Sequence, residues 1–591
     1  MISSLKTSKP HQWYSKLKRM TSYNQQEDVI NVDEISHYSD NFQADIIAEK
    51  FASISNEYDE LNESDIQMPK VDPASVPFFT PAGVLPYLEN LKTNKSSIPG
   101  DIPAKFIKLL ASYISIPFSH IMNTMFKNGE FPLLWKHEIQ TPIPKTYPPT
   151  QISDLRNISG LMNLEKVAEK ILAEMIISDT KANIDISQYG NQPGTSIQHY
   201  LLNMLFKILQ TLDSNSYKEK FAVIATFIDW KEAFPRQCPK LGVEAFVRLG
   251  VRPSIIPILV NFFQDRSMQV KWHNVLSKIH KLKGGGIQGS HLGLLEYIMQ
   301  SNNNTDGIPV DEKFKFIDDL TTLEIVNLLA VGITSLNIKV QVPNDIPTDN
   351  GYIPPESLIT QKRVDAICEW TQKNKMKLNH KKSNIMIFNN TKHFKFSTRI
   401  AMNGEILPVV KKTKILGTIL TDDLKWNVNT SELVKKGNQR LQLLRKTREL
   451  TDNIQDLKII YFLFIRSILE QSAVIWHSSL SEENISDLER VQKNALRIIL
   501  GKSYMSESYE RSLELAGIES LYQRRCHLIQ KFASNCATNV RTKKHFEVNK
   551  KSHDMKTRKT EKYKVHYART VKLKKSAVIH MQNILNKKQD I

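Results

Sequence analysis

Residues 221–229 read FAVIATFID, an apolar run of strand length that is rich in β-branched and aromatic residues and ends in a carboxylate. A strand that ends in Asp229 places this charge at the edge of a sheet, where water or a metal ion can reach it. Helical periodicity marks the segments on both sides, IQHYLLNMLFKILQTL at 197–212 and the pattern at 240–263. The sequence therefore predicts a strand between helices, with an acidic residue at its open end.

A second acidic site is predicted at KFKFIDDL, residues 313–320. Phenylalanines alternate with lysines in this segment, so we expect a strand that buries one face and exposes the other. Asp318 and Asp319 follow at a hairpin turn, and LTTLEIV, residues 320–326, forms the returning strand. Because two adjacent carboxylates repel each other unless a cation compensates their charge, the pair is a candidate cation site.

Taken singly, each acidic site has an ordinary explanation. Aspartate is a frequent residue at strand ends and in turns, and a solvated Asp-Asp turn is more common than a metal site. Together, a strand-end aspartate and an aspartate pair could supply hard oxygen ligands to two Mg²⁺ ions. Such ions activate an attacking hydroxyl and stabilise the leaving oxygen in phosphoryl transfer.

Composition and length exclude several protein classes. The chain has 591 residues, too many for one compact domain of ~100–200 residues. With 41% hydrophobic residues it is not broadly disordered, and no apolar run reaches the ~18 residues of an ordinary membrane-spanning helix. The first twenty residues are basic but lack the apolar core of a secretory signal. Four scattered cysteines form no CxxC pair, so we expect a nuclear or cytoplasmic protein without a zinc finger.

The charge of the chain is strongly positive and unevenly distributed. Lysine and arginine total 80 against 61 acidic residues, a net charge of +19, which favours a polyanionic partner such as nucleic acid. Residues 541–591 hold 16 basic and 4 acidic side chains, whereas residues 27–65 hold 12 acidic side chains and one lysine. The basic tail could be a solvated run, a nuclear address or a phosphate-binding arm.

The predicted helix at 484–501 has two distinct faces at 3.6 residues per turn. The apolar face consists of Leu488, Val491, Ala495 and Ile498. The opposite face consists of Arg490, Lys493 and Arg497. A charged face is ordinary on a surface helix, but an entirely basic face is less common, so we predict that it binds nucleic acid.

Three segments occur in an order that resembles a known enzyme family. FIDWKEAF (227–234), GGGIQGSHLGLL (284–295) and FIDD (316–319) resemble the palm motifs A, B and C of reverse transcriptases of non-LTR (LINE-like) retrotransposons. Further similar stretches lie before, between and after them, among them KMKLNHKKSNIMIF (375–388), which looks like motif D. Because the order extends over more than 400 residues, the resemblance is much more specific than any single motif.

The resemblance implies an α+β right-hand polymerase fold, with an antiparallel palm sheet and a helical thumb. It implies an RNA-directed DNA polymerase, which adds deoxynucleoside triphosphates to the 3′-hydroxyl of a DNA primer on an RNA template, with two Mg²⁺ ions as cofactors and Mn²⁺ as a substitute. The expected divisions are a polar extension at 1–79, fingers at 80–220, palm at 221–425, a helical thumb and C-terminal region at 426–540, and a basic tail at 541–591.

Site residues follow from the same resemblance. Asp229 and Asp318 would bind both metal ions, and Asp319 would complete the charge cluster. Phe234 occupies the position of the steric gate, where a bulky ring fills the space of a ribose 2′-hydroxyl and so favours deoxynucleotides. Without the resemblance, an aromatic residue five positions after a strand end is usually a core residue.

Other predicted nucleotide contacts are less specific. Gln288 and Gly289 open a helix beside the nucleotide and the template base, although a Gly-rich turn alone would be unremarkable; a Walker-type loop is excluded because no Gly-Lys-Ser/Thr follows. Lys145 and Arg156 match fingers positions that grip the triphosphate. Lys382 matches the motif D lysine that can donate a proton to pyrophosphate. Each of these cations, taken alone, is more often a surface charge.

The chain departs from the family pattern at several positions, namely Gln192, Pro235, Ile287, Leu294 and the segment after motif C. None of these changes removes a metal ligand. The first 75 residues are too short for the endonuclease that such elements often encode, so we expect a polymerase that does not nick DNA. Two alternatives remain: a catalytically inactive, retrotransposon-derived protein that binds RNA or DNA, and an RNA-templated RNA polymerase, which Phe234 disfavours.

Overall fold

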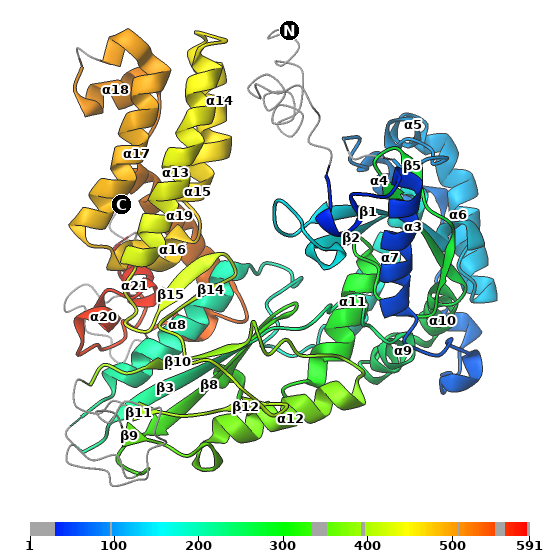
Figure 1. The fold of residues 1–591 in the computed structure, drawn as a ribbon, viewed down its shortest axis with the longest axis horizontal. Coiled ribbons are helices and arrows are strands. Elements are labelled where there is room, and N and C mark those ends of the chain that lie inside the picture. The colour runs from blue at the N-terminus through cyan, green and yellow to red at the C-terminus, as the bar shows by residue number, and fades with distance from the viewer. Residues whose placement is uncertain are drawn as a thin grey trace, which may run out of the picture.

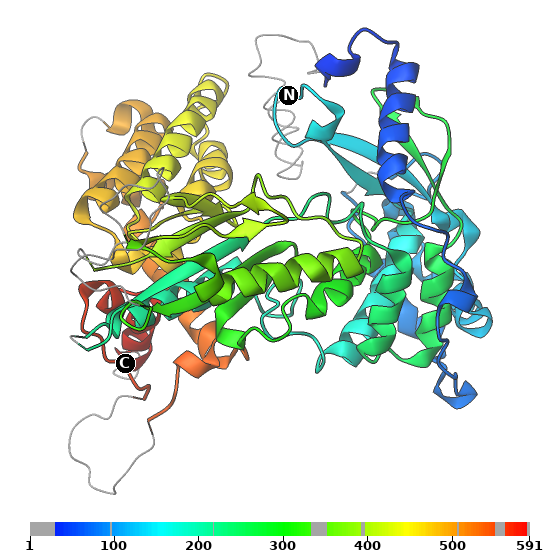
Figure 2. The same cartoon turned by 60° about the horizontal axis from the view of Figure 1, so that its bottom comes forward.

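The computed structural model describes residues 30–94, 97–216, 218–331, 351–391, 396–504, 507–549 and 562–587. Residues 332–350, which belong to the segment after motif C, and parts of the polar extension and the basic tail lie outside these residues. The described part of the chain is a mixture of helices and sheets, as predicted. Figures 1 and 2 show a central sheet with one mainly helical lobe from the first half of the chain and another from the last third.

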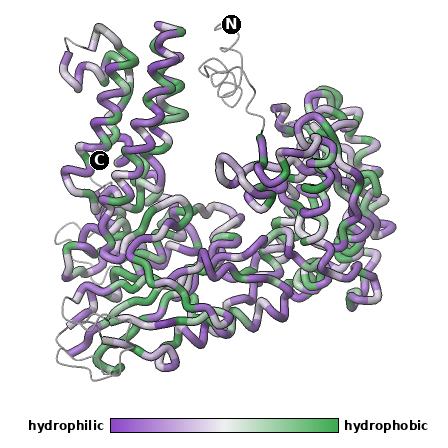
Figure 3. Tube along the Cα trace, in the orientation of Figure 1, coloured by the Kyte–Doolittle hydropathy of each residue, from purple (hydrophilic) through white to green (hydrophobic). Residues whose placement is uncertain are grey.

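The predicted strand at 221–229 forms the interior of a four-stranded antiparallel sheet within the described residues, in the order β10-β3-β8-β7. These strands are β3 (Phe221–Ile228), β7 (Lys313–Phe316), β8 (Asp319–Asn327) and β10 (Asn384–Phe388). Alternate residues of β3 enter two different hydrophobic cores, so both of its faces are buried. This double burial explains why the sequence of β3 is a continuous apolar run, visible as green tube in Figure 3.

Helices cover both faces of this sheet. On one face lies α8 (Ile197–Asp213), whose apolar residues share a core with β3 and with the C-terminal helices. The other face shares a core with α12 (Ile359–Lys373) and with part of α11 (His291–Gln300). The sheet is therefore the structural link between the two lobes.

The lobe from the first half of the chain combines a second sheet with a helical core. Its strands are β1 (His137–Pro144), β2 (Leu155–Gly160), β4 (Arg266–Trp272), β5 (Val275–Leu276) and β6 (His280–Leu282), and β1 pairs with β2 antiparallel and with β4 parallel. Its helices are α3 (Asp40–Ser55), α4 (Pro81–Glu89), α5 (Ala104–Leu109), α6 (Ala111–Asn128), α7 (Asn163–Thr180), α9 (Pro239–Arg248) and α10 (Ile256–Phe263). Within the expected polar extension, α3 forms a helix that packs on β4.

The chain becomes strongly helical after residue 425, as the sequence predicts. The helices are α13 (Asn427–Arg448), α14 (Ile454–Ile460), α15 (Ser467–Leu469), α16 (Ala473–Trp476), α17 (Glu482–Leu500), α18 (Tyr509–Ala516), α19 (Leu521–Thr538), α20 (Val571–Lys574) and α21 (Ala577–Lys587). Between the central sheet and these helices lie the short strands β9 (Gly351–Tyr352), β11 (Phe396–Ser397), β12 (Ala401–Met402), β13 (Glu405–Ile406), β14 (Lys412–Ile415) and β15 (Thr418–Thr421).

The predicted exposed face of the 313–316 strand is wrong. Lys313 and Lys315 of β7 are buried, and their ammonium groups lie 3.1 and 3.0 Å from Asp185. Lys315 also donates to the carbonyl of Asn302 at 2.8 Å. These lysines can be buried because a carboxylate distant in the sequence compensates their charge.

No single described helix is both long and apolar enough to cross a membrane, while the bent pair Ile454–Leu469 and Ala473–Ser479 meets that test by length and composition.

Candidate active site

The register of the central sheet brings the three predicted aspartates to one end. Ile228, the last residue of β3, pairs with Leu320 of β8, so the adjacent Asp229 and Asp319 lie at the same edge. Asp318 occupies the turn between β7 and β8, where Phe316 pairs with Asp319. Residues that are 89 positions apart in the sequence thus meet because β3 and β8 are antiparallel neighbours.

The β7–β8 turn is held in an unusual conformation by the preceding loop. Ile317 has a φ of 59°, a left-handed conformation that is costly for a β-branched residue. The Gln188 side-chain oxygen accepts hydrogen bonds from the backbone N–H groups of Ile317, at 3.1 Å, and Gly190, at 2.9 Å. A Cβ on Gly190 would lie 2.6 Å from the Ile317 side chain, so glycine is needed for this close approach. The segment that contains Gln188 and Gly190 therefore fixes the backbone that presents Asp318.

The three carboxylates influence one another electrostatically. The side chains of Asp318 and Asp319 are exposed, yet the protein around them is dense enough that desolvation is the largest cause of their raised pKa values. The pKa of Asp319 rises to about 7, with additional contributions from the charges of Asp318 and Asp229. Desolvation and the charge of Asp318 also raise the pKa of Asp229. These three carboxylates are open or partly open to solvent, and a cation would stabilise their negative charge.

Two residues that the sequence analysis did not single out fix Asp229. The Asn379 side-chain amide donates to its carboxylate at 3.0 Å, and the backbone N–H of Asp229 donates to the Ser383 hydroxyl at 3.0 Å. Both residues belong to the predicted motif D segment, which therefore could have indicated them. Lys382 lies between them in sequence, and its charge partly opposes the rise in the pKa of Asp229.

The three cations predicted to bind the triphosphate, Lys145, Arg156 and Lys382, belong to different elements but lie in the same region. Burial lowers the pKa of Lys145, Glu232 opposes this shift, and the charges of Arg156 and Lys382 add to it. The charge of Arg156 also partly opposes the rise in the pKa of Asp318. The Lys145 ammonium donates to the Ser153 carbonyl at 2.9 Å. The site therefore combines the acidic edge of the central sheet with positive side chains from the β1–β2 sheet and from the segment before β10.

Phe234 packs against Tyr297 of α11, with ring centroids 5.5 Å apart and an angle of 25° between the planes. The Tyr297 ring is buried, and its hydroxyl has no hydrogen-bond partner among the described residues. Burial and then the charges of Asp318, Asp319 and Asp229 raise the pKa of this phenol. Tyr297, which the sequence analysis missed, thus connects the Phe234 ring to the three carboxylates.

Gln288 and Gly289 precede α11, as predicted, and lie against β2. Gly289 has a φ of +124°, and a Cβ there would lie 2.9 Å from the Ser159 carbonyl oxygen. The Ser159 N–H donates to the Gln288 carbonyl at 2.8 Å. Because Arg156 belongs to the same strand, this contact brings the motif B turn and a predicted nucleotide-binding cation to one element.

The predicted basic face of α17 is exposed but is separate from the carboxylates. The Lys493 ammonium lies 4.8 Å from the Tyr509 ring centroid, and the Arg497 guanidinium lies 5.4 Å from that of Tyr504. Arg490 pairs with Asp487 at 3.2 Å. Two of the three cations thus lie over aromatic rings near α18, and their contact with nucleic acid remains a prediction.

The carboxylates of Asp229, Asp318 and Asp319 are chemically suited to bind a divalent cation. Three carboxylates with raised pKa values are suitable oxygen donors for Mg²⁺. However, among the described residues no group of three or more His, Cys, Asp or Glu side chains is arranged to hold a metal ion.

Comparisons with known proteins found similar sequences. No protein-family model matches the chain. The chain is 26% identical over 271 residues to a probable RNA-directed DNA polymerase from transposon X-element of Drosophila melanogaster. This alignment covers 45% of this chain and 28% of that protein. The chain is 23% identical over 419 residues to a probable RNA-directed DNA polymerase from transposon BS of the same organism, which covers 70% of this chain and 43% of that protein.

Among solved structures, apo telomerase from Candida tropicalis aligns with a TM-score of 0.34 and 12% identity, over 68% of this chain and 66% of that one. The matches to the transposon proteins span less than half of the length of those relatives. Over the matched residues, this chain is similar to the probable RNA-directed DNA polymerases of these two transposons.

Proposed function

We propose that the chain is an RNA-directed DNA polymerase, which adds deoxynucleotides to the 3′-hydroxyl of a primer. The observation that carries this proposal is the meeting of Asp229, Asp318 and Asp319 at one edge of the central sheet. Desolvation raises the pKa of all three, and neighbouring aspartate charges add to the rise for Asp229 and Asp319. The names of the transposon relatives support RNA as the template and DNA as the product. The corresponding partners are an RNA template, a DNA primer and deoxynucleoside triphosphates.

The three aspartates would hold two Mg²⁺ ions, or Mn²⁺ as a substitute. When bound, the ions would lower the pKa of the primer hydroxyl and neutralise charge on the triphosphate. Asn379 and Ser383 would keep Asp229 in position, because both bond to it directly. The repulsion among the carboxylates supports this role, since a bound cation would remove it.

Lys145, Arg156 and Lys382 would bind the triphosphate and the departing pyrophosphate. Their charges act on one another and on the aspartates, which supports a common location beside the reacting phosphates. Lys382 would donate the proton to pyrophosphate. Gln288 and Gly289 would lie beside the nucleotide and the template base.

Phe234 would select deoxynucleotides through its ring. Its stacking on the buried Tyr297 supports this role, because a ring that rests on the protein core resists displacement by a 2′-hydroxyl. We further propose fingers at 80–220, a palm at 221–425, a thumb and C-terminal region at 426–540 and a basic tail at 541–591, in a right-hand arrangement. Within this tail, α21 packs on α19 and α20 packs on α8. Arg490, Lys493 and Arg497 would bind the nucleic acid at the thumb.

A binding protein without catalysis is the second candidate, and one observation favours it. The residues around the motifs depart from the family pattern at Pro235, Ile287 and Leu294. Such a protein would bind an RNA–DNA hybrid and leave the primer unchanged.

Primer extension separates the two candidates. The full chain is incubated with poly(rA)/oligo(dT), dTTP and Mg²⁺, and Asp318→Asn is compared with Asp365→Asn, which removes an exposed aspartate of α12. We expect extension by the unmodified chain and by Asp365→Asn, and none by Asp318→Asn, with equal binding of the hybrid by all three. Binding without extension by the unmodified chain would instead support the binding protein.

A further inference from the structure

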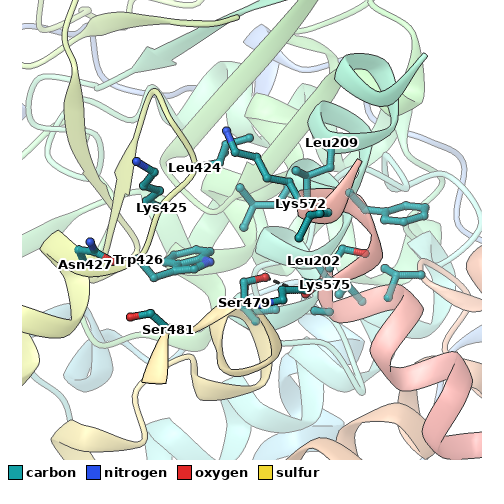
Figure 4. A pocket seen from close by; sticks show the side chains of 17 residues that line it. Leu202, Leu209, Leu424, Lys425, Trp426, Asn427, Ser479, Ser481, Lys572 and Lys575 are labelled. Carbon is teal, nitrogen blue, oxygen red and sulfur yellow. Dashed lines mark hydrogen bonds between the residues drawn. The ribbon is translucent and has the colours of Figure 1, made fainter. Parts of the chain in front are cut away.

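A cavity of about 420 Å³ lies at the base of the C-terminal lobe, on the side of α8. Its walls come from α8, from the residues that join β15 to α13, and from α20 and the start of α21. Figure 4 shows Lys425, Trp426 and Asn427 on one side and Lys572 and Lys575 on the other. The volume falls within the roughly 300–1,000 Å³ that is usual for small-molecule sites.

The floor of this cavity is apolar. Four α8 residues line it, namely Leu202, Leu205, Phe206 and Leu209, and Trp426 lines it as well. Protein cores are close-packed and contain few voids larger than a water molecule. An apolar space of this size is therefore suited to an apolar body that would restore the missing dispersion contacts.

The wall also carries positive charge. Lys425, Lys572 and Lys575 line the cavity, and no carboxylate occurs among the described residues that line it. Lys425 has a weak, exposed partner in Asp423, at 3.5 Å. Three lysines beside an apolar floor attract an anion without offering it a competing acid.

The start of α21 adds donors at the same wall. This helix has 11 residues and begins at Ala577, which lines the cavity with Val578. The first N–H groups of a helix have no acceptor within the helix and attract anions. Ser576, also in the wall, is 3% exposed, and its hydroxyl has no hydrogen-bond partner in the described structure. A buried hydroxyl that is left unpaired at this point is an independent sign of a polar group to be bound.

We propose that this cavity is a binding site for an organic anion with one phosphate or carboxylate head and a compact apolar body. The head would bind at Lys572, Lys575 and Ser576, and the body would lie against α8 and Trp426. Two sources supply this chemistry, a nucleoside monophosphate and a fatty acid. The site is separate from the sheet-edge carboxylates and does not rest on the proposed polymerase activity.

Isothermal titration calorimetry of the full chain with dAMP and, separately, with dodecanoate tests this proposal. We expect one of the two to bind with a stoichiometry of one, and binding to weaken at least tenfold in Lys572→Glu/Lys575→Glu. Lys574→Glu is the matched control, because Lys574 is an exposed lysine of α20 outside the cavity wall. Val571→Trp, at a position that lines the cavity and is 66% exposed, should also weaken binding by occupying space.

The outcomes are distinct. Binding of dAMP alone identifies a nucleotide site, and binding of dodecanoate alone identifies an acyl site. Absence of binding by both probes overturns the proposal. It is also overturned if the double variant binds as well as the unmodified chain, or if Lys574→Glu weakens binding equally.

Discussion

Two groups of carboxylates in this molecule have pKa values that desolvation raises, but they lie in different surroundings. The first, at the edge of the central sheet, consists of Asp229, Asp318 and Asp319. The second, in the core of the first lobe, consists of Glu165, Glu169 and Glu296 around the buried Arg266. The aspartates are open or partly open to solvent and repel one another, whereas the glutamates are fully buried.

The difference shows that a raised pKa is not by itself a sign of function. A cation from solution can reach the aspartates and remove their repulsion, so their raised pKa values indicate a binding site. The glutamates are enclosed, and Arg266 is the cation that acts on all three, so protonation is their main route to neutrality. Variants of the two groups should therefore affect different properties, catalysis for the first and stability for the second.

The largest expected effect is on catalysis at the sheet edge. Asp229→Asn should reduce primer extension to background, because it removes a charge needed to bind the cation, while the urea midpoint of unfolding stays the same or rises. Glu296→Gln, from the buried group, should retain extension. Loss of extension in Glu296→Gln to the same degree as in Asp229→Asn would contradict the separation of the two groups.

The ring beside the acidic edge should control the choice of sugar. Phe234→Ala should lower discrimination against ribonucleotides by about tenfold or more, because the space for a 2′-hydroxyl becomes available. This discrimination is measured as the relative incorporation of UTP and dTTP on a poly(rA) template. Tyr297→Phe keeps the stacked ring and is the matched control; equal discrimination in all three proteins would show that Phe234 is only a core residue.

The buried group should instead limit stability, and Glu296 is its clearest member. Neither of its carboxylate oxygens has a hydrogen-bond partner among the described residues, and burial raises its pKa to about 8. Glu296→Met should raise the free energy of unfolding by about 1–3 kcal/mol at pH 7, since an unpaired buried group is removed. Glu369→Met, at an exposed position of α12, should change it little.

The sign of the pH dependence follows from the same shift. The folded protein retains the Glu296 proton between pH 4.5 and about 8, while the unfolded chain loses it. Glu296 therefore makes stability fall as pH rises through this window, and Glu296→Met should reduce that slope. Urea unfolding at pH 5, 6, 7 and 8 measures the slope of stability against pH. An unchanged slope in the variant would contradict the raised pKa of Glu296.

The smallest expected effect is the response of the exposed group to Mg²⁺. The pKa of Asp319 is raised from 3.8 to about 7, so its contribution to stability also falls as pH rises through this range. Mg²⁺ at ten times its Kd should stabilise the protein at pH 7 by about 1.4 kcal/mol. Thermal unfolding with and without MgCl₂ measures this, and Asp319→Asn should respond less than Glu296→Met does.

Much of the fold could be predicted from local patterns. The apolar run at 221–228 predicted a strand that ends near Asp229, and the Asp-Asp pair at 318–319 predicted a hairpin turn. The helical periodicity predicted α8 and α17. The burial of Lys313 and Lys315 could not be predicted in this way. It depends on Asp185, a carboxylate about 130 positions away, and no pattern within the strand reveals that partner.

The candidate site was predicted in part for the same reason. A resemblance indicates residue types at motif positions, and it led to the aspartates, Phe234 and the three cations. Asn379 and Tyr297 act through contacts across elements, with the Asp229 carboxylate and the Phe234 ring respectively. Such contacts arise only when α11 and the segment before β10 fold against the sheet, so they become visible in the structure.

The meeting of three distant carboxylates at one cation site is tested most directly by Mn²⁺ binding. Electron paramagnetic resonance of free Mn²⁺ in a titration gives the number of ions bound by the full chain, independently of polymerase activity. Bound Mn²⁺ should be lost in Asp229→Asn and in Asp319→Asn alike, and retained in Asp365→Asn. Binding by Asp229→Asn that equals that of the unmodified chain would mean that β3 does not contribute to the site.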